Sequence, residues 1–399
     1  MFDYFVGIDV SKDKFNYCVI NSKLEVVKEG TTSMDYEGFK EFKKLNEEFP
    51  NAVYALESTG SYHINLLSFL ISYKKEVCLV NPALIKRFTQ TISLRKTKTD
   101  TIDAVIIAKF ICKNIEHINY FTFQNIDDIT ALARVRENLA KEIAKVKTQL
   151  KQHLVIVFPE LLINYNVFTN TMLQILKELP TTEIIKAANE KTIQKIFDNI
   201  NVKHKANITP QELISLAKNS IGTSSDTWAM IIKHDTQMLI FLNEQLENIT
   251  NDFINRINSS KKDDMEIITS IKGISDTTAA HFLSEVKDIK RFENRNKLSA
   301  YAGIDPGIKQ SGSSNNFHGR ISKKGSKSLR RCLYLMASGV MKFNPYFRAY
   351  YLKKRNEGMR HRKAMIALCN KLVRILHAML TKREKFHLPS TSDIFNVYS

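Results

Sequence analysis

The chain has 399 residues, of which 43% are hydrophobic and 25% charged, a balance typical of a globular protein with two or three domains. Its five cysteines are scattered, with no CxxC pair and no nearby cysteine–histidine set, so a disulfide framework and a zinc site are not expected. The sequence has no basic and then apolar leader, and no apolar run approaches membrane-spanning length, which predicts a soluble cytoplasmic protein without a membrane partner.

The net charge of +18 is concentrated in the last third of the chain. Residues 261–399 carry 28 Lys and Arg against 11 Asp and Glu, whereas residues 1–120 carry 16 against 15 and residues 121–260 carry 15 against 15. A solvated lysine-rich face is one interpretation of such an excess. A module that binds a polyanion also concentrates positive charge in this way. The distribution therefore favours nucleic acid as a partner.

Residues 1–120 have the pattern of an α/β domain. Strands are predicted at 4–10, 14–20 and 24–32, then at 52–57 and 76–80, with helices over 37–49 and 61–74 and a further helix that begins near Thr99. Three meandering strands followed by alternating strands and helices is the order of the ribonuclease-H-like fold, whose sheet has helices on both faces.

Residues 121–260 change to a helical pattern. Two long helices are predicted, separated by shorter ones that break at Pro159, Pro180 and Pro210. Each long helix carries an apolar seam with coiled-coil spacing, and this seam needs a cover. Either the two helices cover each other as an antiparallel hairpin, or another subunit covers them. The seam residues are Leu132, Leu139, Ile143, Val146 and Leu150 in one helix, and Trp228, Ile232, Leu239, Leu242, Leu246, Ile249 and Phe253 in the other.

Residues 261–399 are predicted to form a mainly α-helical basic domain. Its first segment, 268–286, resembles a helix-hairpin-helix element with a tight turn at Gly273, and such a turn can direct backbone N–H groups at a phosphate. A Gly/Ser-rich loop follows at 303–319. We expect the basic run after this loop to contact the phosphates of DNA or RNA; a solvated helix face is the alternative, but six cations without a polyanion would repel one another. The run consists of Arg320, Lys323, Lys324, Lys327, Arg330 and Arg331.

Four carboxylates of the first domain are candidate metal ligands. Asp9 lies within one apolar strand and Glu57 ends another, positions where a charge is costly unless it is paired or holds a cation. Asp100 and Asp103 are three residues apart and so share one helix face. In a ribonuclease-H-like sheet these four residues could converge on a hard cation such as Mg²⁺, and two such ions roughly 4 Å apart support chemistry at phosphorus.

Each carboxylate also has a plainer interpretation. Asp100 could simply cap its helix, and Asp9 could pair with a lysine, with Asp13 as a nearby competitor for the metal. Tyr62 and His63 follow Glu57 and could either touch a nucleotide or pack at a helix start.

Several long motifs together resemble the insertion-sequence one-ten family of transposases, the DEDD type. They are GIDVSKDKF (7–15), ALESTGSYH (55–63), KTKTDTIDAVIIAKF (96–110), KLSAYAGIDP (297–306) and QSGSSNNFHGRISKKGSKSLRRCLY (310–334), together with segment 268–286. The resemblance covers roughly 1–115 and 265–380, with the motifs in the family's order.

The resemblance implies a RuvC-like N-terminal catalytic domain at 1–120, with Asp9, Glu57, Asp100 and Asp103 as its acidic ligands. It implies a C-terminal transposase domain at 261–399 that supplies a serine nucleophile from a Ser-Gly motif, here Ser311–Gly312. Members of this family resemble one another in using a bridge RNA that pairs with donor and target DNA, and in acting as homodimers or homotetramers.

A serine nucleophile would conserve the broken bond as a phosphoserine ester, so that strands can be exchanged and resealed. Chemistry alone does not separate Ser311 from Ser313 and Ser314, and no role is assigned to nearby Asp305. Two other functions remain open: a RuvC-like nuclease or junction resolvase that uses water, and a non-catalytic nucleic-acid-binding protein on the same scaffold.

Overall fold

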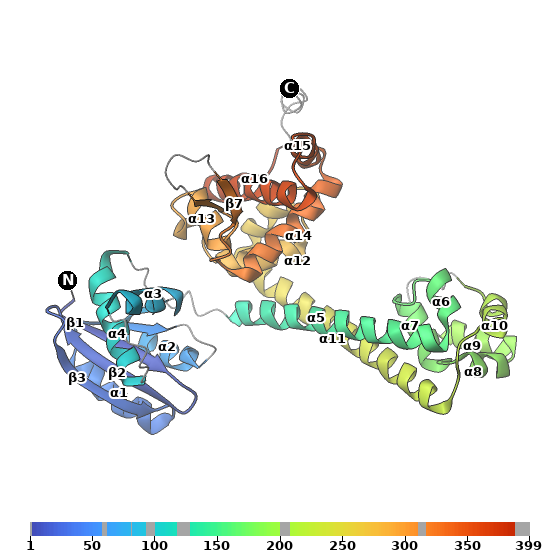
Figure 1. Ribbon diagram of the computed structural model, residues 1–399, viewed down its shortest axis with the longest axis horizontal. Coiled ribbons are helices and arrows are strands. Elements are labelled where there is room, and N and C mark those ends of the chain that lie inside the picture. The colour runs from blue at the N-terminus through green and yellow to red at the C-terminus, as the bar shows by residue number, and fades with distance from the viewer. Residues whose placement is uncertain are drawn as a thin grey trace. The chain divides into compact units, whose positions relative to one another are not determined.

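The chain divides into two compact units, Met1–Asp127 and Asp128–Ser399. The computed structural model describes residues 2–57, 62–80, 82–92, 100–117, 128–199, 208–309 and 317–387 of it. Each unit has hydrophobic cores of its own. Figure 1 labels most of the elements and colours the chain from the N-terminus to the C-terminus.

The first unit is built on a five-stranded mixed sheet with the order β3-β2-β1-β4-β5. The first three strands are antiparallel neighbours, whereas β4 and β5 run parallel to β1. This is the strand order expected of a ribonuclease-H-like domain. The elements are β1 (Tyr4–Val10), β2 (Lys14–Asn21), β3 (Val26–Ser33), α1 (Tyr36–Glu48), β4 (Ala52–Glu57), α2 (His63–Ser72), β5 (Glu76–Val80), α3 (Pro82–Ile92), α4 (Asp100–Asn114) and the short 3-10 helix η1 (Ile115–His117).

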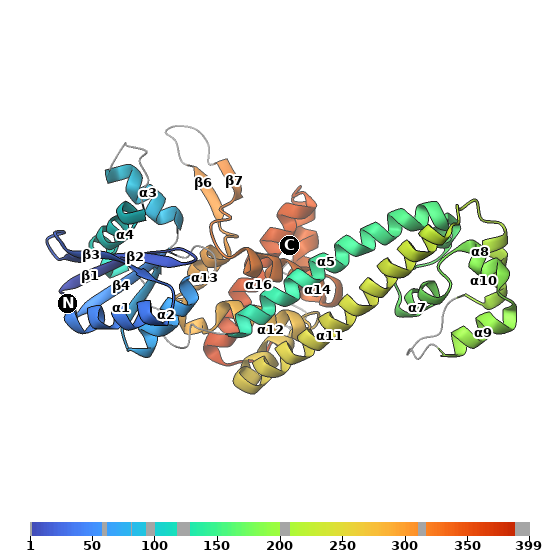
Figure 2. The same cartoon turned by 90° about the horizontal axis from the view of Figure 1, so that it is seen from below.

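Alternate residues of each strand pack into a different core, as the two-residue period of a strand requires. Val6 and Ile8 of β1 face a core that α1 and α2 cover. Phe5 faces the opposite core, which α3 and α4 cover with residues such as Ile107. Figure 2 shows the two pairs of helices on opposite sides of the sheet. The predicted helices on both faces are confirmed.

Helix α3 was not predicted from the sequence, which suggested only a connection after Pro82. The helix begins at this proline, whose fixed φ suits the first helical position. Its buried residue Ile85 and its partly buried Phe88 join the core under α4. Ile85, Phe88 and Ile92 have the spacing of a helix face, so the signal was present in the sequence and was missed.

The second unit is almost entirely helical. Its elements are α5 (Asp128–Val157), α6 (Pro159–Asn164), α7 (Asn170–Glu178), α8 (Thr182–Ala187), α9 (Glu190–Asn199), α10 (Pro210–Lys218), α11 (Asp226–Thr269), α12 (Asp276–Val286), η3 (Ile289–Arg291), α13 (Arg295–Ala302), β6 (Pro306–Lys309), β7 (Phe317–Ile321), α14 (Lys327–Phe343), α15 (Pro345–Asn356) and α16 (His361–Lys382).

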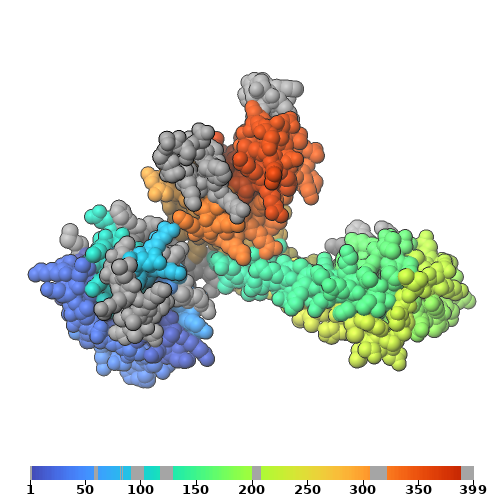
Figure 3. Space-filling view, in the orientation of Figure 1, coloured from blue at the N-terminus to red at the C-terminus, as the bar shows by residue number. Residues whose placement is uncertain are grey.

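The two long predicted helices, α5 and α11, pack against each other as an antiparallel pair. Arg136 of α5 donates to Thr250 of α11 at 3.0 Å. Further along the pair, His153 contacts Asp235 at 2.7 Å. The space-filling view shows the pair as a narrow arm of the second unit (Figure 3). Within one chain, therefore, the apolar seams are covered by the antiparallel hairpin.

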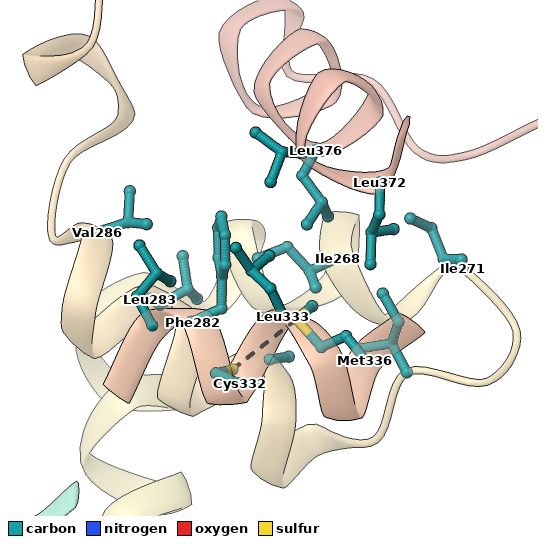
Figure 4. Packing of buried hydrophobic residues seen from close by; sticks show 14 of the residues in the cluster. Ile268, Ile271, Phe282, Leu283, Val286, Cys332, Leu333, Met336, Leu372 and Leu376 are labelled. Atoms are coloured by element: carbon teal, nitrogen blue, oxygen red, sulfur yellow. Dashed lines mark hydrogen bonds between the residues drawn. The ribbon is translucent and has the colours of Figure 1, made fainter. Parts of the chain in front are cut away.

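A core lies at each end of this arm. At the end where α5 finishes and α11 begins, Leu150 of α5 and Ile232 of α11 are fully buried among α6 to α10. At the other end, α12, α14 and α16 enclose the largest core among the described residues, where Phe282 and Leu333 are fully buried. Figure 4 shows how side chains from α11, α12, α14 and α16 interlock there.

The predicted boundary at residues 260 and 261 falls inside α11. This helix runs from Asp226 to Thr269, and its one residue with non-helical angles is Lys261, with φ −143° and ψ 42°. The helix bends where the sequence predicted a new domain to begin. The division of residues 121–399 into two domains stays a prediction, because the contacts group residues 128–399 as one unit.

Helix α16 alone among the described helices is long and apolar enough to cross a membrane, with a mean hydropathy of 1.4 over its best 18-residue window. The expectation that no such run exists was therefore wrong as to length and composition. Half of this window is buried inside the protein, where Leu368, Leu372 and Leu376 are part of the main core. This apolar character is that of a core helix.

Candidate active site

Asp9 and Glu57 lie side by side at the ends of two parallel strands. Ile8 of β1 pairs with Leu56 of β4, so the two acidic residues occupy the next position of the same ladder. Neighbouring strands are about 4.8 Å apart. Both residues are half-buried, and their strand positions share the face that α4 covers. The structure thus brings the two sequence-predicted carboxylates together at one edge of the sheet.

The covering helix carries the other two predicted ligands in its first turn. A Cβ on Gly7 would lie 2.2 Å from the Ala104 carbonyl oxygen and 2.3 Å from the Ala108 nitrogen, so α4 rests directly on the backbone of β1. Gly7 is two residues from Asp9 on the same face, and Ala104 directly follows Asp103. Glycine at position 7 therefore lets the helix approach closely enough to place Asp103 near the strand ends.

Asp103 is half-buried and precedes buried Ile107 by one helical turn. Asp100 is the first residue of α4, but its side chain lies outside the described part of the structure. Among the side chains that are described, no three His, Cys, Asp or Glu groups lie close enough to hold a metal ion together. The convergence of all four carboxylates stays a prediction.

The chemistry of the donor set fits a hard divalent cation. The three described candidates, Asp9, Glu57 and Asp103, offer only carboxylate oxygens, which are donors that suit Mg²⁺, and all three are half-buried. Tyr62, by contrast, is exposed, and His63 is buried at the start of α2. Burial favours the packing interpretation for His63.

Two further polar residues extend the carboxylate row across the sheet, and sequence reasoning missed both. Asn16 of β2 pairs with Asp9 and Thr31 of β3 pairs with Asn16. The Thr31 hydroxyl donates to the Asn16 Oδ1 at 2.6 Å, and Asn16 is buried. The side-chain oxygen of Asn16 is thereby held, which fixes the amide beside Asp9. In the sequence Asn16 is only a polar residue between Phe15 and Tyr17; its burial and its register with Asp9 come from the structure.

The predicted nucleophile Ser311 and its neighbours Ser313 and Ser314 lie outside the described residues. The strands on either side, β6 and β7, pair antiparallel and extend away from the helices of the second unit (Figure 2). Asp305 closes the base of this hairpin, because its side chain accepts a hydrogen bond from the Ser322 hydroxyl and its carbonyl accepts from the Ser322 N–H. Asp305 thus has a structural role.

The residues of the basic run at 320–331 fall into two groups, those that contact the rest of the protein and those that are exposed. Arg330 donates to the Ala302 carbonyl at 3.0 Å, and Arg331 donates to Glu137 of α5 at 2.8 Å. In contrast, Lys323, Lys324 and Lys327 are exposed, and none has an ion pair among the described residues. The side chain of Arg320 lies outside the described part. Three lysines of the run are therefore open to a phosphate, while two arginines hold the fold.

Gly273 lies in the turn between α11 and α12 with a φ of +103°. A Cβ at this position would lie 2.6 Å from the Gly339 carbonyl oxygen of α14. Close packing against α14, as well as the positive φ, therefore explains the glycine. Its predicted contact with a phosphate through the backbone stays untested.

Two family models match the chain. Residues 6–159 match a model described as a transposase, the DEDD type of IS110 elements. Residues 265–352 match a model described as the transposase family of IS116, IS110 and IS902. Together the two segments cover more than half of the sequence. The chain belongs to the IS110 family of transposases.

Two of the similar proteins match this transposase over nearly its whole length, and a third matches a shorter part. A pilin gene-inverting protein of Moraxella bovis is 22% identical over 388 residues, which cover 96% of this chain and 97% of that protein. A transposase for the element IS1328 of Yersinia enterocolitica is 23% identical over 390 residues, 96% and 98% of the two chains. A 43.6 kDa protein of IS110 from Streptomyces coelicolor is 35% identical over 115 residues, 29% of this chain and 28% of that protein.

The transposase also contains a buried polar network that sequence reasoning did not find. His281 of α12 contacts the Ser328 hydroxyl at 2.7 Å, and Ser328 donates to Glu137 of α5 at 3.3 Å. Burial lowers the pKa of His281. Burial raises the pKa of Glu137, but the hydrogen bond from Arg331 and the nearby positive charges outweigh it and leave the pKa below its usual value.

Glu285 forms the second half of this network. Its carboxylate is almost fully buried and accepts from Arg134 of α5 at 3.1 Å and from the Ser326 hydroxyl at 2.7 Å. Ser326 also caps α14. The network thus ties α5, α12 and the start of α14 together. Its partners are 41 to 194 residues apart in sequence, so no local pattern could indicate them.

Proposed function

We propose that this IS110-family transposase is a DNA recombinase with a RuvC-like catalytic unit, in which Asp9, Glu57, Asp100 and Asp103 hold Mg²⁺ and Ser311 is the nucleophile. The observation that carries the proposal is the pairing of Asp9 and Glu57 at adjacent strand ends under a helix whose first turn carries the two aspartates. Family membership supports DNA as the substrate.

The residues divide the chemistry between them. When bound, Mg²⁺ would withdraw charge from the phosphate and stabilise the leaving oxygen. The carboxylates position it, and the Thr31–Asn16 pair keeps the Asp9 end of the row in place. The Ser311 oxygen forms a bond to phosphorus as one P–O ester bond of the DNA breaks, and the leaving oxygen takes up the proton that serine loses. Reversal with a different strand end reseals the DNA.

The name of one similar protein supports recombination over simple hydrolysis. The Moraxella bovis protein that is similar over nearly its full length is named for inverting a pilin gene. Inversion requires that strands be cut and also rejoined. A serine ester conserves the energy of the broken bond for rejoining, whereas attack by water would leave only a break.

We further propose that a bridge RNA selects donor and target DNA, and that the protein acts as a homodimer or homotetramer. The concentration of positive charge in residues 261–399 supports a large polyanionic partner. RNA that copurifies with the protein should include a segment transcribed next to its gene. Recombination by RNA-free protein would contradict the guide role.

The metal site is tested by strand cutting in Mg²⁺. Asp9→Asn removes a charge from the carboxylate row with little change in shape, and we expect cutting to fall by about a thousandfold or more. Asp13→Asn is the matched control, because Asp13 is an exposed carboxylate in the adjoining turn. Equal activity in the two variants, with native far-ultraviolet circular dichroism in both, would refute the assignment.

A further inference from the structure

A second basic region lies at the junction of α15 and α16, apart from the run at 320–331. Residues 353–363 read KKRNEGMRHRK and contain six Lys and Arg with a single acidic residue, Glu357. This acid is already paired with Lys354, at 2.7 Å. The remaining positive charge of the segment is therefore not neutralised within it.

The junction is a defined piece of structure. Helix α15 ends at Asn356 and α16 begins at His361, and Gly358 makes the turn with a φ of +84°. The Tyr351 hydroxyl contacts His361 Nδ1 at 2.8 Å, which links the two helices. The cations consequently lie on one connected surface rather than on a trailing loop.

The cations on this surface are open. Arg355, Arg360, Arg362 and Lys363 are exposed, and within the described ranges no ion pair involves Arg360, Arg362 or Lys363. The orange-red residues around 350 and beyond are in open view in Figure 3. Of these four, Arg355 donates a hydrogen bond to the Met359 carbonyl.

A solvated lysine-rich face looks different in the same protein. On α1, Lys40 lies 3.6 Å from Glu37 and Lys43 lies 3.9 Å from Glu47, so both signs alternate. The α15–α16 junction lacks this alternation. In addition, Arg362 and Lys363 lie in the first turn of α16, where the helix dipole disfavours positive charge. An arrangement that works against local stability is explained if a polyanion binds there.

We propose that the basic junction, residues 353–363, binds the phosphate backbone of duplex DNA. The proposal rests on the proposed function, since it adds a holding surface to a protein that cuts DNA. The second family match ends at residue 352, so the junction lies outside both matched segments. Lysine and arginine contacts to phosphates fix the position of DNA without reading its sequence, and we expect binding that does not depend on sequence.

The test is a titration of a fluorescein-labelled duplex of arbitrary sequence with full-length protein, without metal, followed by fluorescence anisotropy at several salt concentrations. The variant R360Q/R362Q/K363Q removes three exposed charges. The control K40Q/K43Q/K44Q removes three exposed charges from α1, on the face of the sheet opposite the carboxylates. Thermal unfolding of both variants is compared with that of the wild type.

We expect the junction variant to bind duplex roughly tenfold more weakly and to lose about 2.7 from the slope of log K against log salt, since each phosphate contact contributes about 0.9. The control should bind like the wild type. Unchanged binding by the junction variant, an equal loss in the control, or a loss confined to single-stranded RNA would overturn the proposal. Because no strand is cut in this assay, its outcome is independent of the metal and serine assignments.

Discussion

Carboxylates in the two units have opposite surroundings. In the first unit, Asp9 and Glu57 stand at adjacent strand ends, half-buried at one edge of the sheet. In the second unit, Glu137 and Glu285 lie between helices and accept from arginines and serines. The first arrangement is set by strand register, and the second by contacts between distant helices.

We expect this difference to separate catalytic carboxylates from structural ones. A buried carboxylate whose oxygens are occupied by donors stabilises the contact that it makes and has little left for a ligand. Carboxylates at a sheet edge that a helix crosses closely can instead converge on a cation. We therefore expect variants of Asp9 and Glu57 to change catalysis, and variants of Glu137 and Glu285 to change stability.

The largest effect is expected at the crossing of α4 over β1. Gly7→Val would force side-chain atoms into the backbone of Ala104 and Ala108, and should cost about 3 kcal/mol or more. Urea unfolding of the full-length protein measures this. Gly358→Ala is the control, because a Cβ there meets no atom within 4 Å and only its positive φ is strained, at about 1 kcal/mol. Equal costs would contradict the close crossing.

Asn16 tests whether the polar row supports the metal ligands. Asn16→Ala leaves Asp9 without its cross-strand polar neighbour and should raise the Mg²⁺ concentration needed for half-maximal cutting by about 10- to 100-fold. Thr31→Val, which removes only the hydroxyl that holds Asn16, should give a smaller shift in the same direction. A lower maximal rate at an unchanged Mg²⁺ requirement would contradict this role.

Smaller effects are expected in the basic run at 320–331, where one variant should change stability alone and another should change DNA affinity alone. Arg331→Gln breaks the contact with Glu137 and, because the arginine is half exposed, should cost about 1 kcal/mol of stability while DNA affinity holds. Lys323→Gln combined with Lys327→Gln should weaken DNA binding and leave stability unchanged. Anisotropy and urea unfolding on the same samples measure both. Loss of affinity in Arg331→Gln alone would reverse the division.

The smallest effect is a pH dependence from His281. Burial lowers its folded pKa below the ordinary value of 6.5, so the unfolded chain binds a proton more readily. The stability that is linked to neutral His281 is therefore fully present above pH 6.5 and is lost as the pH falls through the folded pKa of His281. His281→Gln should flatten this decline, whereas His361→Gln, at an exposed position, should not. Unfolding midpoints between pH 7.5 and about 5.5 measure the difference.

The sequence predicted the first unit well because its elements follow local periods. Apolar runs at 4–10 and 52–57 placed Asp9 and Glu57 on buried strands, and the three-residue spacing placed Asp103 on the helix face with Asp100. Asn16 was missed because a polar residue in a strand is ordinary until register sets it beside Asp9.

The second unit was less predictable because its polar contacts join residues far apart in the chain. No local pattern shows that Arg331 pairs with Glu137, 194 residues away. The basic run therefore looked uniform in the sequence, and the three-dimensional contacts divide it. Helix α16, in the same way, has the composition of a membrane span but the burial of a core helix.

The joint action of the carboxylates and Ser311 is tested most directly by mapping a covalent protein–DNA adduct by mass spectrometry after reaction in Mg²⁺. We expect a nucleotide ester on Ser311 in the wild-type protein and in Asp13→Asn, and no adduct in Ser311→Ala or Asp9→Asn. An adduct that persists in Ser311→Ala, or that forms equally in Asp9→Asn, would contradict the joint action of the carboxylates and the serine.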